Sequence, residues 1–179
     1  EGMANHRGSL LGGFSDGQPA QKTFEARVAC ALARFDPARP VVVEAESSKV
    51  GQINLPPKLW AAMRTAPRIE VAAPIAARAE FLTRAYADVI ARPDDLRAKL
   101  QPLRQHRGHE TVDRWEALLD VADHVALAAA LMRDHYDPSY AKSRAVHAPH
   151  FLGTVTAERL DDDGLARAAA QIAALTQDT

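Results

Sequence analysis

The sequence has little cysteine, no long apolar run and almost no net charge. Cys30 is the one cysteine among 179 residues, so no disulfide can form within the chain. No apolar run approaches the roughly 20 residues that a bilayer-spanning helix needs, and no signal peptide is visible. The formal net charge is −1, so nucleic-acid binding would require a local basic patch. We therefore expect a cytoplasmic protein with no membrane partner.

The chain also lacks the phosphate loop G-x-x-x-x-G-K-[ST]. Hydrophobic residues make up 47% of the sequence and charged residues 25%, a balance that at this length is enough for one domain with a buried core. The first residues, Glu1 to Ala4, resemble a segment in the middle of a fold. We therefore expect the natural protein to extend upstream of them.

The apolar pattern over residues 21–90 alternates between helical and β-strand periods. Phe24, Val28, Leu32 and Phe35 recur at helical spacing, whereas residues 40–45 form a β-branched run. The pattern predicts helices over 21–35, 56–63 and 74–90, and buried strands over 40–45 and 68–73. Such an alternation is typical of an α/β fold with a parallel sheet and crossover helices.

After Ile90 the pattern becomes mainly helical. It predicts helices over 94–105 and 110–135, and Asp137-Pro138 is expected to end the second one. A strand over 150–157 and a last helix follow, the helix beginning at the acidic residues Asp161–Asp163. The predicted organisation is an α/β domain over 1–92, a helical subdomain over 93–145, and a returning strand with a C-terminal helix over 146–179.

The first candidate site is the polar segment Asn5-His6-Arg7-Gly8-Ser9. His6 and Arg7 offer donors to an anion, and Gly8 lets backbone N–H groups approach it. The amides of Gln18 and Gln21, further along, could hydrogen-bond a base or a sugar. The alternatives are an ordinary surface loop and a glutamine that simply occupies the first turn of a helix.

The second candidate site is Glu44-Ala45-Glu46-Ser47, which directly follows a valine run. Nucleotide-binding α/β folds place a metal-orienting or base-like carboxylate at the carboxyl end of a buried strand. Glu44 and Glu46 would share one face of an extended strand and repel, unless a metal ion or an arginine lies between them. Lys49 could reach a phosphate. If the strand has already ended, both carboxylates are instead solvated.

Cationic and aromatic side chains provide further candidates. Arg78 and Arg84 lie on the helix after the second strand, where P-loop proteins often aim arginines at phosphates. Residues 97–114 are the most basic stretch and suit an RNA backbone, and Tyr136 and Tyr140 could stack on bases. The predicted RNA contacts in the basic stretch are Arg97, Arg104, His106, Arg107 and Arg114. The alternatives are exposed helix faces, a charged helical hairpin and packing tyrosines.

Neither the cysteine nor the histidines form a recognisable motif. Cys30 lies in the first predicted helix and is expected to be a buried packing residue rather than a nucleophile. The histidines show no zinc-ligand spacing, so no metal site is predicted from them.

Taken in order, these segments resemble the tRNA 2-selenouridine synthase family. The resemblance covers most of residues 2–143, is specific over 5–67, and is only general over 145–179. The residues that carry it are Asn5–Ser9, Gln18–Gln21, Phe24-Glu25, Asp36-Pro37, Pro40, Val43-Glu44, Glu46-Ser47, Val50-Gly51, Leu55-Pro56, Met63, Ala66-Pro67, His135–Pro138 and Tyr140.

The resemblance implies a P-loop-NTPase-like α/β domain with a helical subdomain. The family joins a rhodanese domain, which carries a catalytic cysteine, to a P-loop domain. It acts on 2-thiouridine at the wobble position of tRNA, geranylates the sulfur with geranyl diphosphate, and then replaces the S-geranyl group with selenium from selenophosphate. This chain would correspond to the P-loop domain downstream of its phosphate loop.

The resemblance also implies roles for the candidate residues. His6, Arg7, Gly8 and Ser9 would form the rim of a diphosphate cradle. Glu44 and Glu46 would orient the nucleophile or a metal ion, with Mg²⁺ as the ion that could accompany geranyl diphosphate, and Ser47 would be a further catalytic residue. Arg78 and Arg84 would neutralise diphosphate or selenophosphate. The basic stretch would hold the tRNA anticodon arm.

The chain departs from the family pattern because it has no rhodanese domain, no family cysteine and no phosphate loop. We therefore expect the chain alone to be unable to complete the reaction. Two other readings fit the same alternation of elements. One is a P-loop small-molecule or nucleoside kinase relative, and the other is a non-catalytic RNA-binding fragment. Upstream sequence and turnover on tRNA would discriminate between them.

Overall fold

A computed structural model of the chain describes residues 1–44, 47–144 and 150–177, with the backbone alone at 141–144. The chain divides into two compact units, residues 1–66 and residues 67–179. In the described part, no helix is both long and apolar enough to cross a bilayer.

The first unit is built on two helices and a small hairpin. In chain order its elements are η1 (Gly2–Ala4), α1 (Gln21–Leu32), β1 (Lys49–Val50), β2 (Ile53–Asn54) and α2 (Pro57–Thr65). The strands β1 and β2 pair antiparallel, and the chain turns between them at Gly51, where φ is +60°. Ala4, Phe24, Val28 and Ile53 form the buried core. The helix predicted after Pro56 is confirmed, with proline in its first turn.

Three expectations for the first unit are wrong. The described residues of 40–45 form no strand, and Val41, Val42 and Val43 are 43%, 63% and 45% exposed. A β-branched run becomes a strand only where a partner supplies a hydrogen-bonding ladder, and among the described residues this run has none. The first helix ends at Leu32 rather than Phe35, and both side chains are exposed. Cys30 is also exposed, because Phe24 and Val28 supply the buried face of α1.

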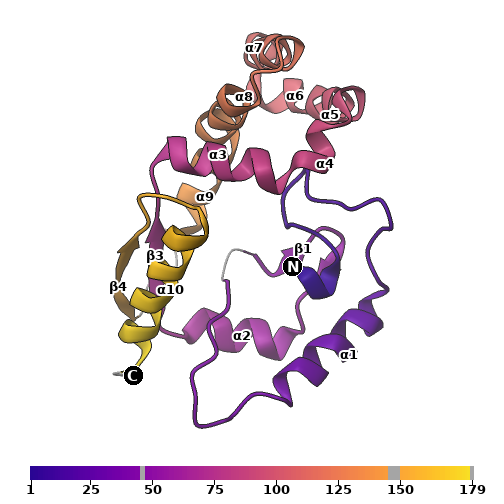
Figure 1. The fold of residues 1–179 in the computed structure, drawn as a ribbon. Helices are drawn as coiled ribbons and strands as arrows, with labels where there is room; N and C mark the ends of the chain where they lie inside the picture. Colours follow the sequence, from indigo (N-terminus) through magenta and orange to yellow (C-terminus); the bar gives the residue numbers. More distant parts are fainter. Residues whose placement is uncertain (45–46, 145–149, 178–179) are drawn as a thin grey trace. The chain divides into compact units, whose positions relative to one another are not determined.

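The second unit contains a two-stranded parallel sheet. β3 (Arg68–Ala72) pairs with β4 (Phe151–Thr156), from Ile69 opposite Gly153 to Ala72 opposite Thr156. Helix α10 (Asp162–Thr176) packs on β4, and Val155, Ala157 and Ala168 form the core between them (Figure 1). Both strands and the last helix are as predicted. The sheet is smaller than the sequence pattern suggests, because only these two strands pair in parallel among the described residues.

Helices fill the chain between β3 and β4. In order they are α3 (Ile75–Ala85), α4 (Ala87–Ile90), α5 (Pro93–Leu100), η2 (Gln101–Leu103), α6 (Arg104–Arg107), α7 (His109–Asp120), α8 (His124–Leu131), the π-helical turn η3 (Met132–Tyr136) and α9 (Asp137–Arg144). Helix α3 packs against α8, and α7 packs against both α5 and α8. Leu100, Val112 and Trp115 are fully buried in this part of the unit.

Two predicted helix boundaries in this region are wrong. The helix expected over 110–135 is broken at Ala122, which has a left-handed φ of +55°, and Asp123 then caps α8 by accepting a hydrogen bond from the Ala126 N–H at 3.0 Å. Asp137-Pro138 begins α9 instead of ending a helix. Proline clashes with the carbonyl four residues before it, and the wider π turn of η3 accommodates the ring at this point.

Candidate functional site

The Asn5–Ser9 segment is a closed, internally bonded loop. The Asn5 side-chain amide donates to Asp16 Oδ1 at 2.8 Å and to the Gly17 carbonyl at 2.7 Å. His6 forms a β-bridge with Gly13, and its Nδ1 accepts a hydrogen bond from the Gly8 N–H at 3.0 Å. The loop is therefore ordered by its own backbone and side chains before any ligand arrives.

Charged side chains gather at this loop. The Arg7 guanidinium lies over the Phe14 ring at 4.1 Å from its centroid. Burial and the nearby Glu44 carboxylate raise the pKa of Glu1, while the positive charge of Arg7 acts in the opposite direction. The Glu1 carboxylate also lies against Gly8, where a Cβ atom would approach its Oε1 to 2.7 Å. Glu44 and Arg7 thus lie close enough to Glu1 for their charges to act on its carboxylate.

Gln18 and Gln21 are both bonded to the backbone of the β1–β2 hairpin. The Gln18 amide donates to the Val50 carbonyl at 2.9 Å and accepts from the Gln52 N–H at 2.7 Å. Gln21 makes the same kind of pair with both backbone groups of Asn54, at 2.8 and 3.0 Å. These amides bind the hairpin to the start of α1. Their contact with a base or sugar stays a prediction.

The acidic segment does not follow a β-strand, although its sequence suggests one, as far as its described residues show. Glu44 is exposed and belongs to no strand, and Glu46 lies outside the described residues. Ser47 Oγ accepts a hydrogen bond from the Lys49 N–H at 3.0 Å, which closes a local turn, and Lys49 is exposed. Among the described residues, no three histidine, cysteine or acidic side chains are placed to hold a metal ion.

The two arginines of α3 are bonded within the second unit. Arg78 forms a bidentate ion pair with Asp137, with N–O distances of 3.0 and 2.6 Å. Arg84 donates to the Leu160 carbonyl at 2.9 Å. These contacts tie α3 to the start of α9 and to the loop before α10. A role for either arginine at a phosphate stays a prediction.

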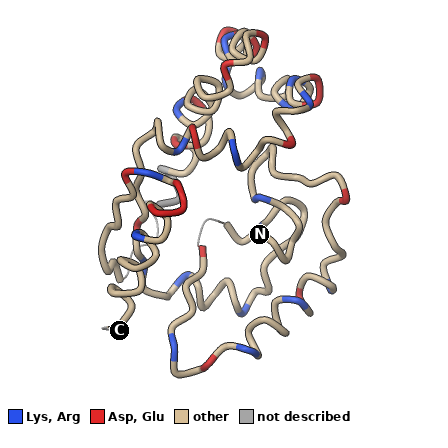
Figure 2. Tube along the Cα trace, viewed as in Figure 1, with Lys and Arg blue, Asp and Glu red and all other residues tan. Residues whose placement is uncertain are grey.

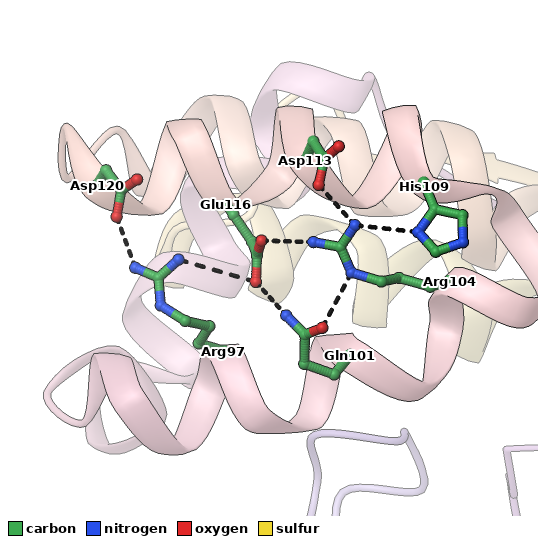
Figure 3. Close-up of polar contacts among 7 residues, drawn as sticks. All are labelled: Arg97, Gln101, Arg104, His109, Asp113, Glu116 and Asp120. Atoms are coloured by element: carbon green, nitrogen blue, oxygen red, sulfur yellow. Dashed lines mark hydrogen bonds and ion pairs between the residues drawn. The ribbon is translucent and has the colours of Figure 1, made fainter.

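The basic stretch carries carboxylates as well as cations, and both signs of charge lie along α5 and α7 (Figure 2). Figure 3 shows that α5, η2, α6 and α7 are joined by a set of contacts, which we call the Glu116 network. Its members are Arg97, Gln101, Arg104, His109, Asp113, Glu116 and Asp120.

Glu116 lies at the centre of this network. Arg104 pairs with Glu116 at 2.7 Å and with Asp113 at 2.6 Å, and Arg97 pairs with Asp120 at 2.5 Å and more distantly with Glu116 at 3.8 Å. The hydrogen bonds that Arg97 and Arg104 donate to carboxylates, chiefly to Asp120 and Asp113 respectively, raise the pKa values of both arginines. Much of the charge in the basic stretch is therefore balanced inside the unit.

Arg107 has a different environment from these two arginines. Its Nε donates to His135 Nδ1 at 2.9 Å, and its Nη2 donates to the His135 carbonyl at 3.0 Å and to Ser139 Oγ at 2.9 Å. Burial, followed by the positive charges of Arg107 and His106, lowers the pKa of His135. His135 is thereby favoured in the neutral form that can accept the Arg107 hydrogen bond.

The helical segment formed by η3 and α9 carries the aromatic residues beside Arg107. The centroids of the His135 and Tyr136 rings are 4.9 Å apart in an edge-to-face arrangement, and those of the stacked Tyr136 and Tyr140 rings are 6.3 Å apart. Arg114 is exposed and lies 3.7 Å from Asp134.

Sequence reasoning missed His135 and Ser139 as partners of Arg107, and it missed Glu116 as the centre of the charge network. The signal for Glu116 was present, since Asp113, Glu116 and Asp120 recur at helical spacing.

Comparison with known proteins identifies the family to which the chain belongs. The sequence profile of the tRNA 2-selenouridine synthase AAA domain matches residues 1–162. The chain belongs to this family. The mixed α/β architecture of the chain, with its small parallel sheet, is compatible with a P-loop-like AAA domain. The family resemblance seen in the sequence is confirmed.

Individual tRNA 2-selenouridine synthases support the same assignment. The proteins of that name from Hahella chejuensis and Chromohalobacter salexigens are 34% and 31% identical to the chain, over 79% and 78% of its length and 45% of their own. The protein from Cupriavidus pinatubonensis is 31% identical over 79% of the chain and 46% of its own length. The chain thus spans about half the length of the curated relatives it matches. No solved structure matches it.

Proposed function

We propose that this chain is part of a tRNA-modifying transferase that converts wobble 2-thiouridine into 2-selenouridine through an S-geranyl intermediate. The observation that carries the proposal is the family match over residues 1–162, which includes both candidate loops and the whole basic stretch. Relatives that bear the name tRNA 2-selenouridine synthase support tRNA as the substrate. Geranyl diphosphate and selenophosphate are the proposed donors.

The Asn5–Ser9 loop is the part of the first unit best suited to a diphosphate. Geranyl transfer forms a bond from the thiouridine sulfur to the geranyl carbon and releases diphosphate, so negative charge develops on the leaving oxygen. Arg7 and the loop backbone would stabilise this charge, because fixed N–H groups and cations need no reorganisation during the step. The loop is already ordered, as the bonds of Asn5 and His6 indicate.

The acidic segment would act beside that loop. The Glu44 carboxylate lies close enough to Glu1 to raise its pKa, and it belongs to the same unit as Arg7. Mg²⁺ remains a prediction tied to Glu44 and Glu46, of which only Glu44 lies among the described residues. Arg78 and Arg84 would supply positive charge near diphosphate or selenophosphate in the second unit.

The test uses the full-length enzyme, 2-thiouridine-containing tRNA and both donors. Arg7→Ala and Glu46→Ala are expected to slow geranylation, selenation or both by roughly tenfold or more, as for loss of a transition-state contact. Arg34→Ala is the matched control, because Arg34 is an exposed arginine of the same unit outside the candidate loops. Mass spectrometry of the tRNA nucleosides separates the two half-reactions. If both variants leave both half-reactions intact, the site lies elsewhere.

A further inference from the structure

Arg107 differs from three other arginines of the second unit in the chemistry of its hydrogen-bond partners. Arg78, Arg97 and Arg104 are each bonded to carboxylates. The three acceptors of Arg107 are instead a neutral ring nitrogen, a carbonyl and a hydroxyl. In the part of the chain that the structure describes, no carboxylate pairs with this guanidinium. Its positive charge is therefore oriented but not neutralised.

The donors of Arg107 can be counted. A guanidinium carries five N–H groups in one plane. The Nε–H bonds to His135 Nδ1, and the two hydrogens on Nη2 are accounted for by the His135 carbonyl and Ser139 Oγ. The two hydrogens on Nη1 have no acceptor among the described residues. They project from a side chain whose rotamer is already fixed at three points, so little conformational entropy is lost when they bind a ligand.

The surroundings of Arg107 favour an anion. His106 and His109 flank it along the chain, and between them lies Gly108, where a Cβ would meet nothing within 4 Å. The nearest acidic residue in sequence is the exposed Glu110. His106 is exposed and close enough for its charge to influence His135. A fixed guanidinium that keeps two N–H donors on Nη1 and has no acidic partner among the described residues suits the anionic oxygens of a phosphate.

We propose that Arg107 is a phosphate-binding residue and that His135 and Ser139 are the positioning residues that aim it. The choice of a tRNA phosphate as the ligand rests on the proposed function. The phosphate could also belong to a free diphosphate, which presents the same oxygens. Tyr136 and Tyr140 lie on the segment that holds Arg107, which places an aromatic surface beside the phosphate contact and favours the nucleic acid.

The first experiment measures binding of unmodified tRNA to the 179-residue chain by fluorescence anisotropy over a series of salt concentrations. Arg107→Gln is expected to weaken binding about tenfold and to lower the slope of log K against log[salt] by roughly 0.7 to 0.9, the value for one lost phosphate contact. Arg133→Gln removes the same charge from an exposed arginine within η3. It is expected to weaken binding less than threefold. Equal effects of the two variants would overturn the proposal.

The second experiment tests the positioning residues by a double-mutant cycle. Ser139→Ala is expected to weaken tRNA binding about threefold in the parent chain and to have no effect in the Arg107→Gln background. The salt slope of Ser139→Ala should stay at the parent value, because the charge remains. A purely structural role would give the same loss in both backgrounds and would contradict the assignment. Thermal unfolding of each variant checks that the chain is folded.

The source of the phosphate is decided by competition with inorganic pyrophosphate, measured by calorimetry. If Arg107→Gln weakens tRNA binding and leaves pyrophosphate binding unchanged, the ligand is the RNA backbone, which is the expected result. If pyrophosphate binding is lost instead, the ligand is a free diphosphate. If neither changes, Arg107 binds no phosphate. These binding measurements need no turnover, so they can succeed even where conversion of 2-thiouridine, and with it the proposed function, fails.

Discussion

At the scale of single residues, Gly51 is a position with little freedom to change. It adopts a φ of +60° between β1 and β2, a region that side-chain-bearing residues rarely occupy. A Cβ atom there would also clash with Gln18 Oε1 and approach the His6 ring at 2.7 to 2.8 Å. Gly17 is a natural comparison, since its φ is +73° but a Cβ would meet nothing within 4 Å.

Gly51→Ala is therefore expected to destabilise the first unit more than Gly17→Ala. The left-handed backbone alone costs about 1 kcal/mol for alanine, and the clash adds roughly 1 to 3 kcal/mol of overpacking. Urea unfolding of both variants, monitored with a probe in the first unit, measures the difference in stability. Equal losses would mean that the Gln18 and His6 side chains move aside freely and do not hold the hairpin against the loop.

Residue types were easier to predict than their partners. The sequence correctly singled out Arg97, Arg104 and Arg107 as a cluster of cations. It could not tell that the first two pair with carboxylates and the third with neutral groups, because these partners lie up to 32 residues away and depend on how the helices pack. The sequence also could not reveal the partners of Gln18 and Gln21, since a glutamine amide can hydrogen-bond a backbone group or a ligand equally well.

At the scale of elements, Glu116 is expected to contribute more to stability than the outer acids of its network. Its side chain is 16% exposed and bonds both Arg104 and Gln101, whereas the Asp120 side chain is 61% exposed. Exposed ion pairs contribute little because water and salt screen them, while removal of a half-buried acceptor leaves its donors unpaired.

Glu116→Ala should accordingly lower the free energy of unfolding by about 1 to 2 kcal/mol, and the control Asp120→Ala by about 0.5 kcal/mol or less. Chemical denaturation at low salt measures both values. At about 1 M salt the effect of Asp120→Ala should vanish, whereas most of the Glu116→Ala effect should persist. A larger loss from Asp120→Ala than from Glu116→Ala would contradict this view of the network.

The elements that the sequence predicted well are those whose signals are local. Prolines open α2, three aspartates open α10, and β3 is a short alternating run bounded by prolines, so each is specified within a few residues. The valine run before Glu44 has an equally strong local signal and still forms no strand, because a strand also needs a partner. The break at Ala122 and the start of α9 at Asp137 depend on capping and on a π turn, which periodicity does not reveal.

At the scale of the whole molecule, the two units have cores of different quality. The first unit relies on a few buried residues around Phe24 and on strands of two residues, and it leaves Phe35 and the valine run exposed. The second unit buries Trp115 and Leu100 completely and adds a separate core under α10. Because hydrophobic burial is the main source of stability, the first unit is expected to unfold at lower urea concentration than the second.

The chain contains one suitable probe for each unit. Cys30 is exposed on α1 and can carry an environment-sensitive dye, while Trp115 is buried in α7. In a Trp60→Phe background the intrinsic fluorescence reports Trp115 alone, since these are the two tryptophans of the chain. The dye signal should change at a lower urea midpoint than the tryptophan signal, and Gly51→Ala should shift only the dye transition. Coincident transitions with equal midpoints and slopes would instead mean that the units unfold together as one two-state domain, and the Asn5–Ser9 loop would then be as stable as the helical part that holds Arg107.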